Sequence, residues 1–310
     1  MKTLPNTSYG YENINVSVVD FHKRIAQHIW DVYKMTWRDL QDVKYNENDA
    51  RVQKAVDDVI KMRALPVPRE QCIITFRIEN ISRVCLAQLT RQRKAAFNVE
   101  SQMPQAVNHN VIVPYNIAIS EKYAERANAL AEASRKLYDD LIEDGIPYQD
   151  ARYLLLHGQT TSLVYMVDIN TFIHSFTMRC ENNLSDEINL VYRLCLNALH
   201  EALNLNAQYG AIDALTYKFY KEVLKNCDCL GANQKKGMNR DAVFGNSFKR
   251  YPDANSDITD ITTNAACDFK KSAWFFELDR MYDNNPELLF DGEKEMIEKW
   301  RSDNESDKSI

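Results

Sequence analysis

Two prolines, Pro66 and Pro68, separate a segment with the hydrophobic spacing of a helix from one with the composition of a strand, and this change most constrains the fold. Residues 52–60 carry valine and isoleucine at helical spacing. The helix they predict must end near residue 64, because Pro66 and Pro68 cannot continue it. The following segment, residues 71–78 (QCIITFRI), is rich in β-branched residues and predicts a buried strand. The chain must therefore combine helices with buried strands.

Hydrophobic spacing also predicts the other elements. Ser82 has the side chain of a helix N-cap, and Gly145 with Pro147 supplies a helix stop. Helices are expected over residues 21–33, 82–94, 120–144, 149–156, 170–178 and 185–203, and strands over 111–115 and 162–167. Residues 230–263 are rich in Gly, Asn, Asp and Ser, which predicts irregular structure before weaker helical signals around 275–282 and 293–300.

Composition excludes several classes of protein. The 310 residues are 26% charged and 45% hydrophobic, which is typical of a globular protein and excludes collagen-like, mucin-like and wholly disordered chains. The net charge of −6 argues against a partner that is a nucleic-acid polymer. Residues 251–310 hold fifteen acidic and seven basic side chains, so the first 250 residues sum to +2 and leave room for a local basic pocket.

Cysteine usage and the first residues predict a cytoplasmic protein. The seven cysteines are an odd number and are scattered, which favours reduced thiols over a disulfide scaffold. Cys227-x-Cys229, with distant Cys267 and His200, lacks the spacing of a zinc site, so we expect no metal. The N-terminus has no apolar signal region, and no stretch approaches the roughly 18 apolar residues that span a bilayer, so no membrane partner is expected.

The segment most informative about function is residues 88–103, QLTRQRKAAFNVESQM. Arg91 and Arg93 are two positions apart at an expected helix end and therefore point in different directions. Because guanidinium groups match phosphate geometry, the two side chains could hold anionic groups of different ligands. A basic helix end that only interacts with the helix dipole would explain the same run.

One family shares the spacing of this segment. Arg91-x-Arg93 followed by seven residues and Ser101 resembles the R-H-R-x7-S signature of the flavin-dependent thymidylate synthases. Gln88 stands where that family has a glutamine, and residues 68–76 resemble its flavin-contacting turn and strand.

A second block is in register with the first. Arg152 and Arg179 are 27 positions apart, which is the separation that the family has, and Glu187-Ile188 follows as the family's Glu-Ile does. The resemblance covers roughly residues 15–225. We therefore expect a domain of this type over residues 1–225, with a C-terminal extension, 226–310, packed on or beside it.

The resemblance implies a fold and an activity. The fold would be α/β (α+β), with a mixed central sheet flanked by helices, and the protein a homotetramer with sites shared between subunits. The activity would be transfer of a one-carbon unit from methylenetetrahydrofolate to C5 of a pyrimidine deoxynucleotide, first of all dUMP to dTMP. FAD would be the cofactor, with methylenetetrahydrofolate and NADPH as co-substrates.

The resemblance also implies the site residues. Those for the nucleotide are Gln88, Arg91, Val99, Glu100, Ser101, Gln102, Met103, Arg152 and Arg179. Those for the flavin are Glu70, Arg91, Gln92, Arg93, Lys94, Asp168, Asn170 and His174. Arg179 would be catalytic, because a cation near N3 and O4 stabilises negative charge that develops on the uracil ring. Taken alone, His174 between apolar neighbours would instead indicate a core histidine.

This chain departs from the family pattern at several positions. Gln92 replaces the signature histidine, Leu65 replaces a histidine near the flavin, and Met103 replaces an arginine. Residues 98–101 (NVES) replace Asn-Glu-x-Ser, so the carboxylate lies one position later than in the family. Asp168-Ile169-Asn170 stands where Asn-x-Arg is expected. Two cationic contacts to phosphates are thus missing.

These departures leave other functions open. Water access to the intermediate would give 5-hydroxymethyl-dUMP. A dCMP substrate is a further alternative, since Asp168 or Glu100 would favour the amino group of cytosine, whereas Arg179 favours uracil. The remaining alternative is a non-catalytic relative that binds a nucleotide.

Overall fold

The computed structural model describes most of the first 228 residues and isolated positions near the C-terminus. The described residues are 13–64, 66–103, 110–114, 117, 121–180, 186–228, 282, 283, 286, 294, 297, 298 and 301. Leu65, Cys229, Cys267 and residues 230–263 lie outside them. In the described part, no helix has the length and apolar character needed to cross a bilayer.

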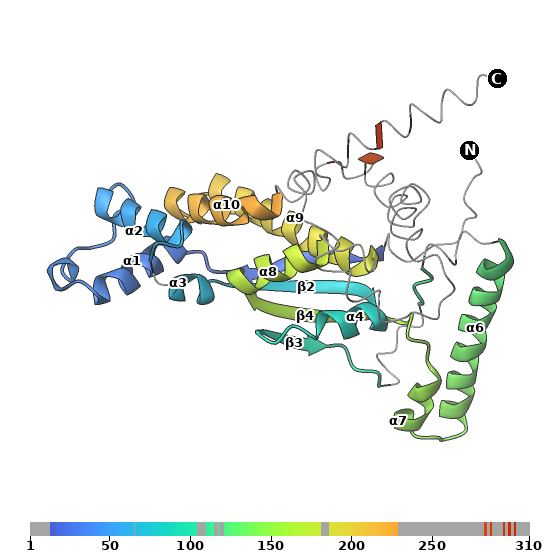
Figure 1. Ribbon diagram of the computed structural model, residues 1–310. Coiled ribbons are helices and arrows are strands. Elements are labelled where there is room, and N and C mark those ends of the chain that lie inside the picture. Colours follow the sequence, from blue (N-terminus) through green and yellow to red (C-terminus); the bar gives the residue numbers. More distant parts are fainter. Residues whose placement is uncertain are drawn as a thin grey trace, which may run out of the picture.

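A four-stranded sheet forms the centre of the molecule (Figure 1). Its strands are β1 (Asn15–Phe21), β2 (Ile73–Ser82), β3 (Ala95–Val99) and β4 (Thr160–Asp168), in the order β1-β2-β4-β3. Every neighbouring pair is antiparallel, whereas a mixed sheet was expected. The reason is that β4 inserts between β2 and β3, which run in the same direction and would otherwise be parallel neighbours. The α+β class is confirmed.

Helices are distributed along the whole described chain. They are α1 (Ile25–Met35), α2 (Ala50–Ile60), α3 (Val67–Glu70), α4 (Arg83–Leu89), α6 (Glu121–Glu143), α7 (Tyr148–Ala151), α8 (Ile169–Cys180), α9 (Asp186–Gln208) and α10 (Ala214–Asp228), with short 3-10 turns η2 (Arg38–Leu40) and η3 (Arg152–Leu154). The expected strand at 111–115 is reduced to one isolated bridge between Val111 and Gln159. β1 and β3 were not predicted, and the expected first helix begins at Ile25 because Phe21 belongs to β1.

One face of the sheet carries the core. Alternate side chains of β2 and β4 are buried on this face, beneath α8 and α9 (Figure 1). The ring centroid of Phe76 lies 5.5 Å from that of Phe172 on α8, and Phe97 stacks on Tyr165 at 5.2 Å. A fully buried ring such as Phe76 contributes about 1.5–3 kcal/mol. Ile297, in the expected extension, is fully buried in the same core cluster.

The opposite face of the sheet, called here the open face, has exposed side chains. Arg77 of β2, Asn98 of β3 and Met166 of β4 lie on it, and Met166 is 43% exposed. Their neighbours in sequence point into the core, because successive side chains of a strand alternate between faces. The core-facing side of the sheet is therefore buried within the chain, and the open face is exposed at these positions.

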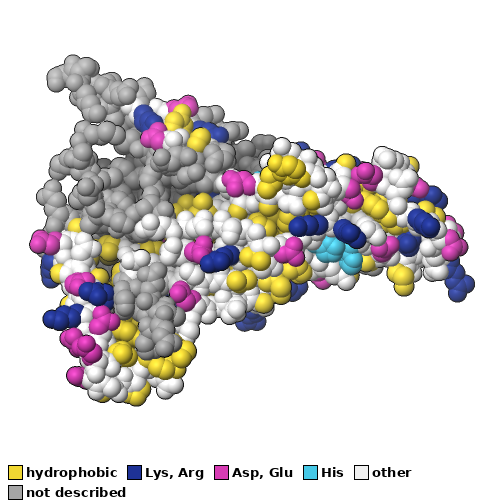
Figure 2. Space-filling view, turned by 180° about the vertical axis from the view of Figure 1, so that it is seen from behind, with side chains coloured by type: hydrophobic (Ala, Val, Ile, Leu, Met, Phe, Trp, Pro, Cys, Tyr) yellow, Lys and Arg dark blue, Asp and Glu magenta, His cyan; other side chains and the backbone are white. Residues whose placement is uncertain are grey.

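Helices α6 and α7 form an arm that extends away from the sheet (Figure 1). Ser134 Oγ donates to the carbonyl of Leu154 at 2.6 Å and so ties α6 to the 3-10 turn that follows α7. Leu130 and Leu137 on α6 are 59% and 47% exposed, and hydrophobic side chains are visible on the arm in the view from behind (Figure 2). Apolar residues at helical spacing here thus lie on the surface of the single chain.

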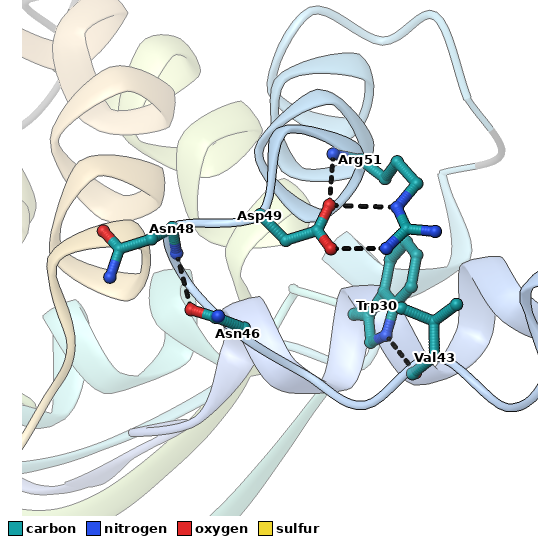
Figure 3. Close-up of polar contacts among 6 residues, drawn as sticks. All are labelled: Trp30, Val43, Asn46, Asn48, Asp49 and Arg51. Carbon is teal, nitrogen blue, oxygen red and sulfur yellow. Dashed lines mark hydrogen bonds and ion pairs between the residues drawn. The ribbon is translucent and has the colours of Figure 1, made fainter.

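Hydrogen bonds also fix the end of the molecule far from the arm, and Figure 3 shows several of them. Trp30 Nε1 donates to the carbonyl of Val43 at 3.1 Å. Asp49 caps α2 by accepting the backbone N–H of Arg51 at 2.8 Å, and it also accepts the Arg51 guanidinium. Other partners at this end are distant in sequence, since Lys218 of α10 donates to Asp57 at 2.7 Å.

Candidate functional site

A basic turn joins α4 to β3. The helix ends at Leu89, earlier than expected, and the Thr90 hydroxyl donates to the carbonyl of Leu86 at 2.9 Å. Arg91, Arg93 and Lys94 follow in the turn with exposed side chains. No carboxylate of the described chain forms an ion pair with any of the three. Their charges are consequently available to an anionic ligand.

Gln92, between these cations, is held by the neighbouring helix. Ser175 of α8 is buried, and its hydroxyl donates to Gln92 Oε1 at 2.5 Å. This bond joins segments 83 positions apart and fixes the turn against α8. The residue that replaces the signature histidine thus has a positioning contact of its own.

Arg179 and Gln88 meet where α8 ends beside α4. Arg179 Nη2 donates to the backbone carbonyl of Gln88 at 3.2 Å. Gln88 Oε1 is buried and has no hydrogen-bond partner in the described chain. A buried polar atom without a partner is costly, so this oxygen is suited to a ligand donor. Two residues that we expected to bind the nucleotide are thereby brought together.

The loop after β3 is joined to β4 by Glu100. Its backbone N–H donates to the Ser162 carbonyl at 2.9 Å, and its carboxylate accepts the Ser162 N–H at 2.9 Å. The displaced carboxylate is therefore engaged with backbone. Gln102 Nε2 lies 3.5 Å from Gln159 Oε1, and the Ser101 hydroxyl accepts the Met103 N–H at 3.2 Å.

Three further residues were expected at the nucleotide. Val99 ends β3 and is half-buried, paired with Leu163 of β4. Met103 is 45% exposed and Arg152 is exposed in the turn after α7.

The residues expected at the flavin lie on α3, in the basic turn, at the end of β4 and on α8. Asp168, just before α8, accepts the Thr171 N–H at 2.9 Å and the Thr171 hydroxyl at 2.6 Å, so its carboxylate caps the helix. Asn170 is half-buried, while His174 and Glu70 are exposed. The interpretation of His174 as a core histidine is therefore wrong.

A buried carboxylate that sequence reasoning did not assign to any role fixes the start of α4. Glu187 of α9 accepts the Ser82 N–H at 2.6 Å and the Ser82 hydroxyl at 2.5 Å. Burial raises the pKa of Glu187, while the bonds from Ser82 oppose that shift. Ser82 also accepts the Cys85 N–H at 3.0 Å, as the predicted N-cap should. Through Ser82, Glu187 therefore orients α4, the helix that carries Gln88.

Comparison with known proteins identifies the family. Residues 17–203, more than half of the chain, match the family model described as Thymidylate synthase complementing protein. The chain belongs to this family.

Relatives with curated names cover parts of the chain. A flavin-dependent thymidylate synthase of Geobacter sulfurreducens is 31% identical over 114 residues, which are 36% of this chain and 49% of that protein. The chain thus spans about half the length of that relative. One from Pyrococcus furiosus is 26% identical over 178 residues, 54% of this chain and 72% of that protein. Among solved structures, the UMP/dUMP methylase PolB from Streptomyces cacaoi has a TM-score of 0.49 at 17% identity, covering 67% of this chain and 94% of that one.

Proposed function

We propose that this chain is a flavin-dependent enzyme that transfers a one-carbon unit from methylenetetrahydrofolate to C5 of a pyrimidine deoxynucleotide, converting dUMP to dTMP. The observation that carries the proposal is the contact between Arg179 and Gln88 beside a basic turn whose charges have no protein partner in the described chain. Membership of the family and the names of the curated relatives support it.

The described residues fit FAD. Arg91, Arg93 and Lys94 offer cations to its phosphate groups without first breaking an ion pair of the described chain. Asn170 and His174 on α8 offer polar groups from the helix against which the turn is fixed. When bound, FAD supplies the chemistry of one-carbon and hydride transfer, with NADPH as the reductant.

The protein's own contribution is orientation and electrostatics. Gln88 Oε1 would accept a hydrogen bond from the pyrimidine edge, in a place where water is excluded. Arg179, held through the Gln88 carbonyl, would stabilise negative charge on the ring and make C5 more nucleophilic. Ser101 would bind the sugar-phosphate end, and Arg152 would orient the pyrimidine ring.

We also propose a cytoplasmic homotetramer. The open face of the sheet and the arm both expose apolar side chains, including Met166, Leu130 and Leu137. Burial of such surfaces between copies of the chain stabilises an assembly. Light scattering coupled to size exclusion should give four times the mass of the chain, and a monomer would contradict the assembly without affecting the proposed chemistry.

One experiment tests the proposed reaction. Purified protein is incubated with FAD, NADPH, methylenetetrahydrofolate and dUMP, with a parallel sample containing dCMP, and the nucleotides are identified by mass spectrometry. We expect dTMP from dUMP. A hydroxymethylated product, or a product from dCMP alone, would replace the proposed reaction by one of the two variant chemistries. Binding of dUMP without any product would support a non-catalytic relative.

A further inference from the structure

Arg83, the first residue of α4, lies against the loop that we assign to the nucleotide. Its backbone N–H donates to the Gln159 carbonyl at 3.0 Å, and Val84 N–H donates to the His157 carbonyl at 3.2 Å. Its side chain crosses to the other segment, where Nη2 lies 3.4 Å from the backbone oxygen of Glu100. Arg83 therefore contacts both the turn before β4 and the residue that precedes Ser101.

The Arg83 guanidinium is incompletely satisfied by the protein. The side chain is half-buried, and its Nε atom is buried without a hydrogen-bond partner in the described chain. Burying a guanidinium N–H without an acceptor is unfavourable, and the one contact that the group makes within the described residues is long for a hydrogen bond. The guanidinium is thus available to a ligand acceptor.

The charges around Arg83 favour an anion. Burial lowers the pKa of Arg83; the Glu100 carboxylate opposes this shift, and the nearby Arg152 guanidinium adds to it. The Glu100 carboxylate already accepts the Ser162 N–H, so it is only partly available to Arg83. An anion beside the Arg83 guanidinium would supply the missing acceptor.

We propose that Arg83 binds the phosphate group of the nucleotide, beside Ser101. The inference rests on the proposed function, because that function assigns the loop to the nucleotide. Met103 is exposed and uncharged where an arginine was expected in the sequence, and Arg83 reaches the same loop from α4. The cation that the loop lacks is thereby supplied from a different element. No signal in the sequence indicated it.

Paired ligands separate this inference from the proposed function. The full chain loaded with FAD is titrated by calorimetry with dUMP and with deoxyuridine, which lacks only the phosphate. Arg83→Gln should weaken dUMP binding by roughly 10- to 100-fold, as loss of a charged hydrogen bond does, and should leave deoxyuridine binding unchanged. Arg51→Gln is the matched control, since this arginine has its own carboxylate partner at the far end of the molecule (Figure 3), and it should change neither affinity.

A second substitution tests whether the lost group is a cation at the loop. Adding Met103→Arg to the Arg83→Gln variant should raise its dUMP affinity at least tenfold. If Arg83→Gln does not fold, Arg83→Lys decides, because lysine keeps the charge but loses the planar fork; it should weaken dUMP binding several-fold and deoxyuridine binding not at all.

Three results would overturn the inference. Unchanged dUMP affinity in the Arg83 variants, or an equal loss for both ligands, would show that Arg83 does not bind the phosphate, with the proposed function intact. Failure of the unsubstituted protein to bind dUMP would overturn the proposed function and the inference together.

Discussion

Two regions of this molecule hold their arginines in opposite ways. At the start of α2, Arg51 donates to both carboxylate oxygens of Asp49, at 3.0 Å from Nε and 2.6 Å from Nη2 (Figure 3). The hydrogen bonds from Arg51 hold the pKa of Asp49 at about 2. In the turn after α4, Arg91, Arg93 and Lys94 have no such partner in the described chain.

This difference in pairing distinguishes charges that serve the structure from charges that can bind a ligand. An arginine whose partner lies two residues away is neutralised before any ligand arrives, and exposed pairs of this kind contribute little. Cations left without a partner repel one another, and an anionic ligand removes that cost. The basic turn is therefore expected to respond to ligands, and the start of α2 is not.

The largest effect should come from Arg179. Within the described residues, its side chain donates one hydrogen bond, to the Gln88 carbonyl. Arg179→Ala should lower kcat by roughly a hundredfold to a thousandfold, because a charge that stabilises the reacting ring is lost. The fold should remain intact, as judged by circular dichroism and thermal melting. Turnover at the level of the unsubstituted protein would remove Arg179 from its proposed role.

The next effect sharpens the contrast between the two arginine settings. Arg91→Ala should weaken the binding of dUMP and of FAD by roughly ten- to a hundredfold, since a charged hydrogen bond is lost. Arg51→Ala should leave both affinities unchanged, because its guanidinium is already engaged by Asp49. Flavin fluorescence and calorimetry measure the two constants. Equal effects of the two substitutions would break the comparison.

The buried carboxyl group of Glu187 should make the free energy of unfolding depend on pH. Burial raises the pKa of Glu187, so the folded protein keeps this proton to a higher pH than the unfolded chain, whose carboxyl titrates near 4.5. The Glu187 contribution to the free energy of unfolding is thus fully present below that value and falls as pH rises through the raised pKa.

Glu187→Gln should remove this dependence, which amounts to at most about 1.4 kcal/mol per pH unit for one proton. Urea unfolding of both proteins from pH 4 to pH 8 measures it. Parallel stability curves for the two proteins would show that Glu187 does not titrate in this range.

The smallest effect concerns the anchor of the basic turn. Ser175→Ala removes the hydroxyl that donates to Gln92 and should lower the free energy of unfolding by about 1 kcal/mol. It should also weaken FAD binding several-fold, since Gln92 would no longer be fixed between its cationic neighbours. Ser134→Ala on the arm is the control, because it loses a similar bond far from the turn. An identical FAD affinity in both variants would argue against a positioning role for Ser175.

Local signals in the sequence were sufficient for several elements. The helical stripe of α6 with its Gly and Pro stop, the Ser82 cap, and the β-branched runs of β2 and β4 are each encoded within a few residues, and all four are found in the structure. The spacing of Arg91, Arg93 and Ser101 with the second block around Arg179 was sufficient for the family. The division at residue 225 stays a prediction.

Only the tertiary structure decided the rest. β1 and β3 are short edge strands, and β3 (AAFNV) has weak strand propensity, so their strand structure depends on pairing with β2 and β4. The contacts that build the site join residues distant in sequence: Ser82 with Glu187, Gln92 with Ser175, and Gln88 with Arg179. Hydrogen-bond partners and buried unpaired atoms such as Arg83 Nε are properties of packing between elements. A sequence specifies residue types and local periods, but which groups are left for a ligand follows from which groups the fold has already paired.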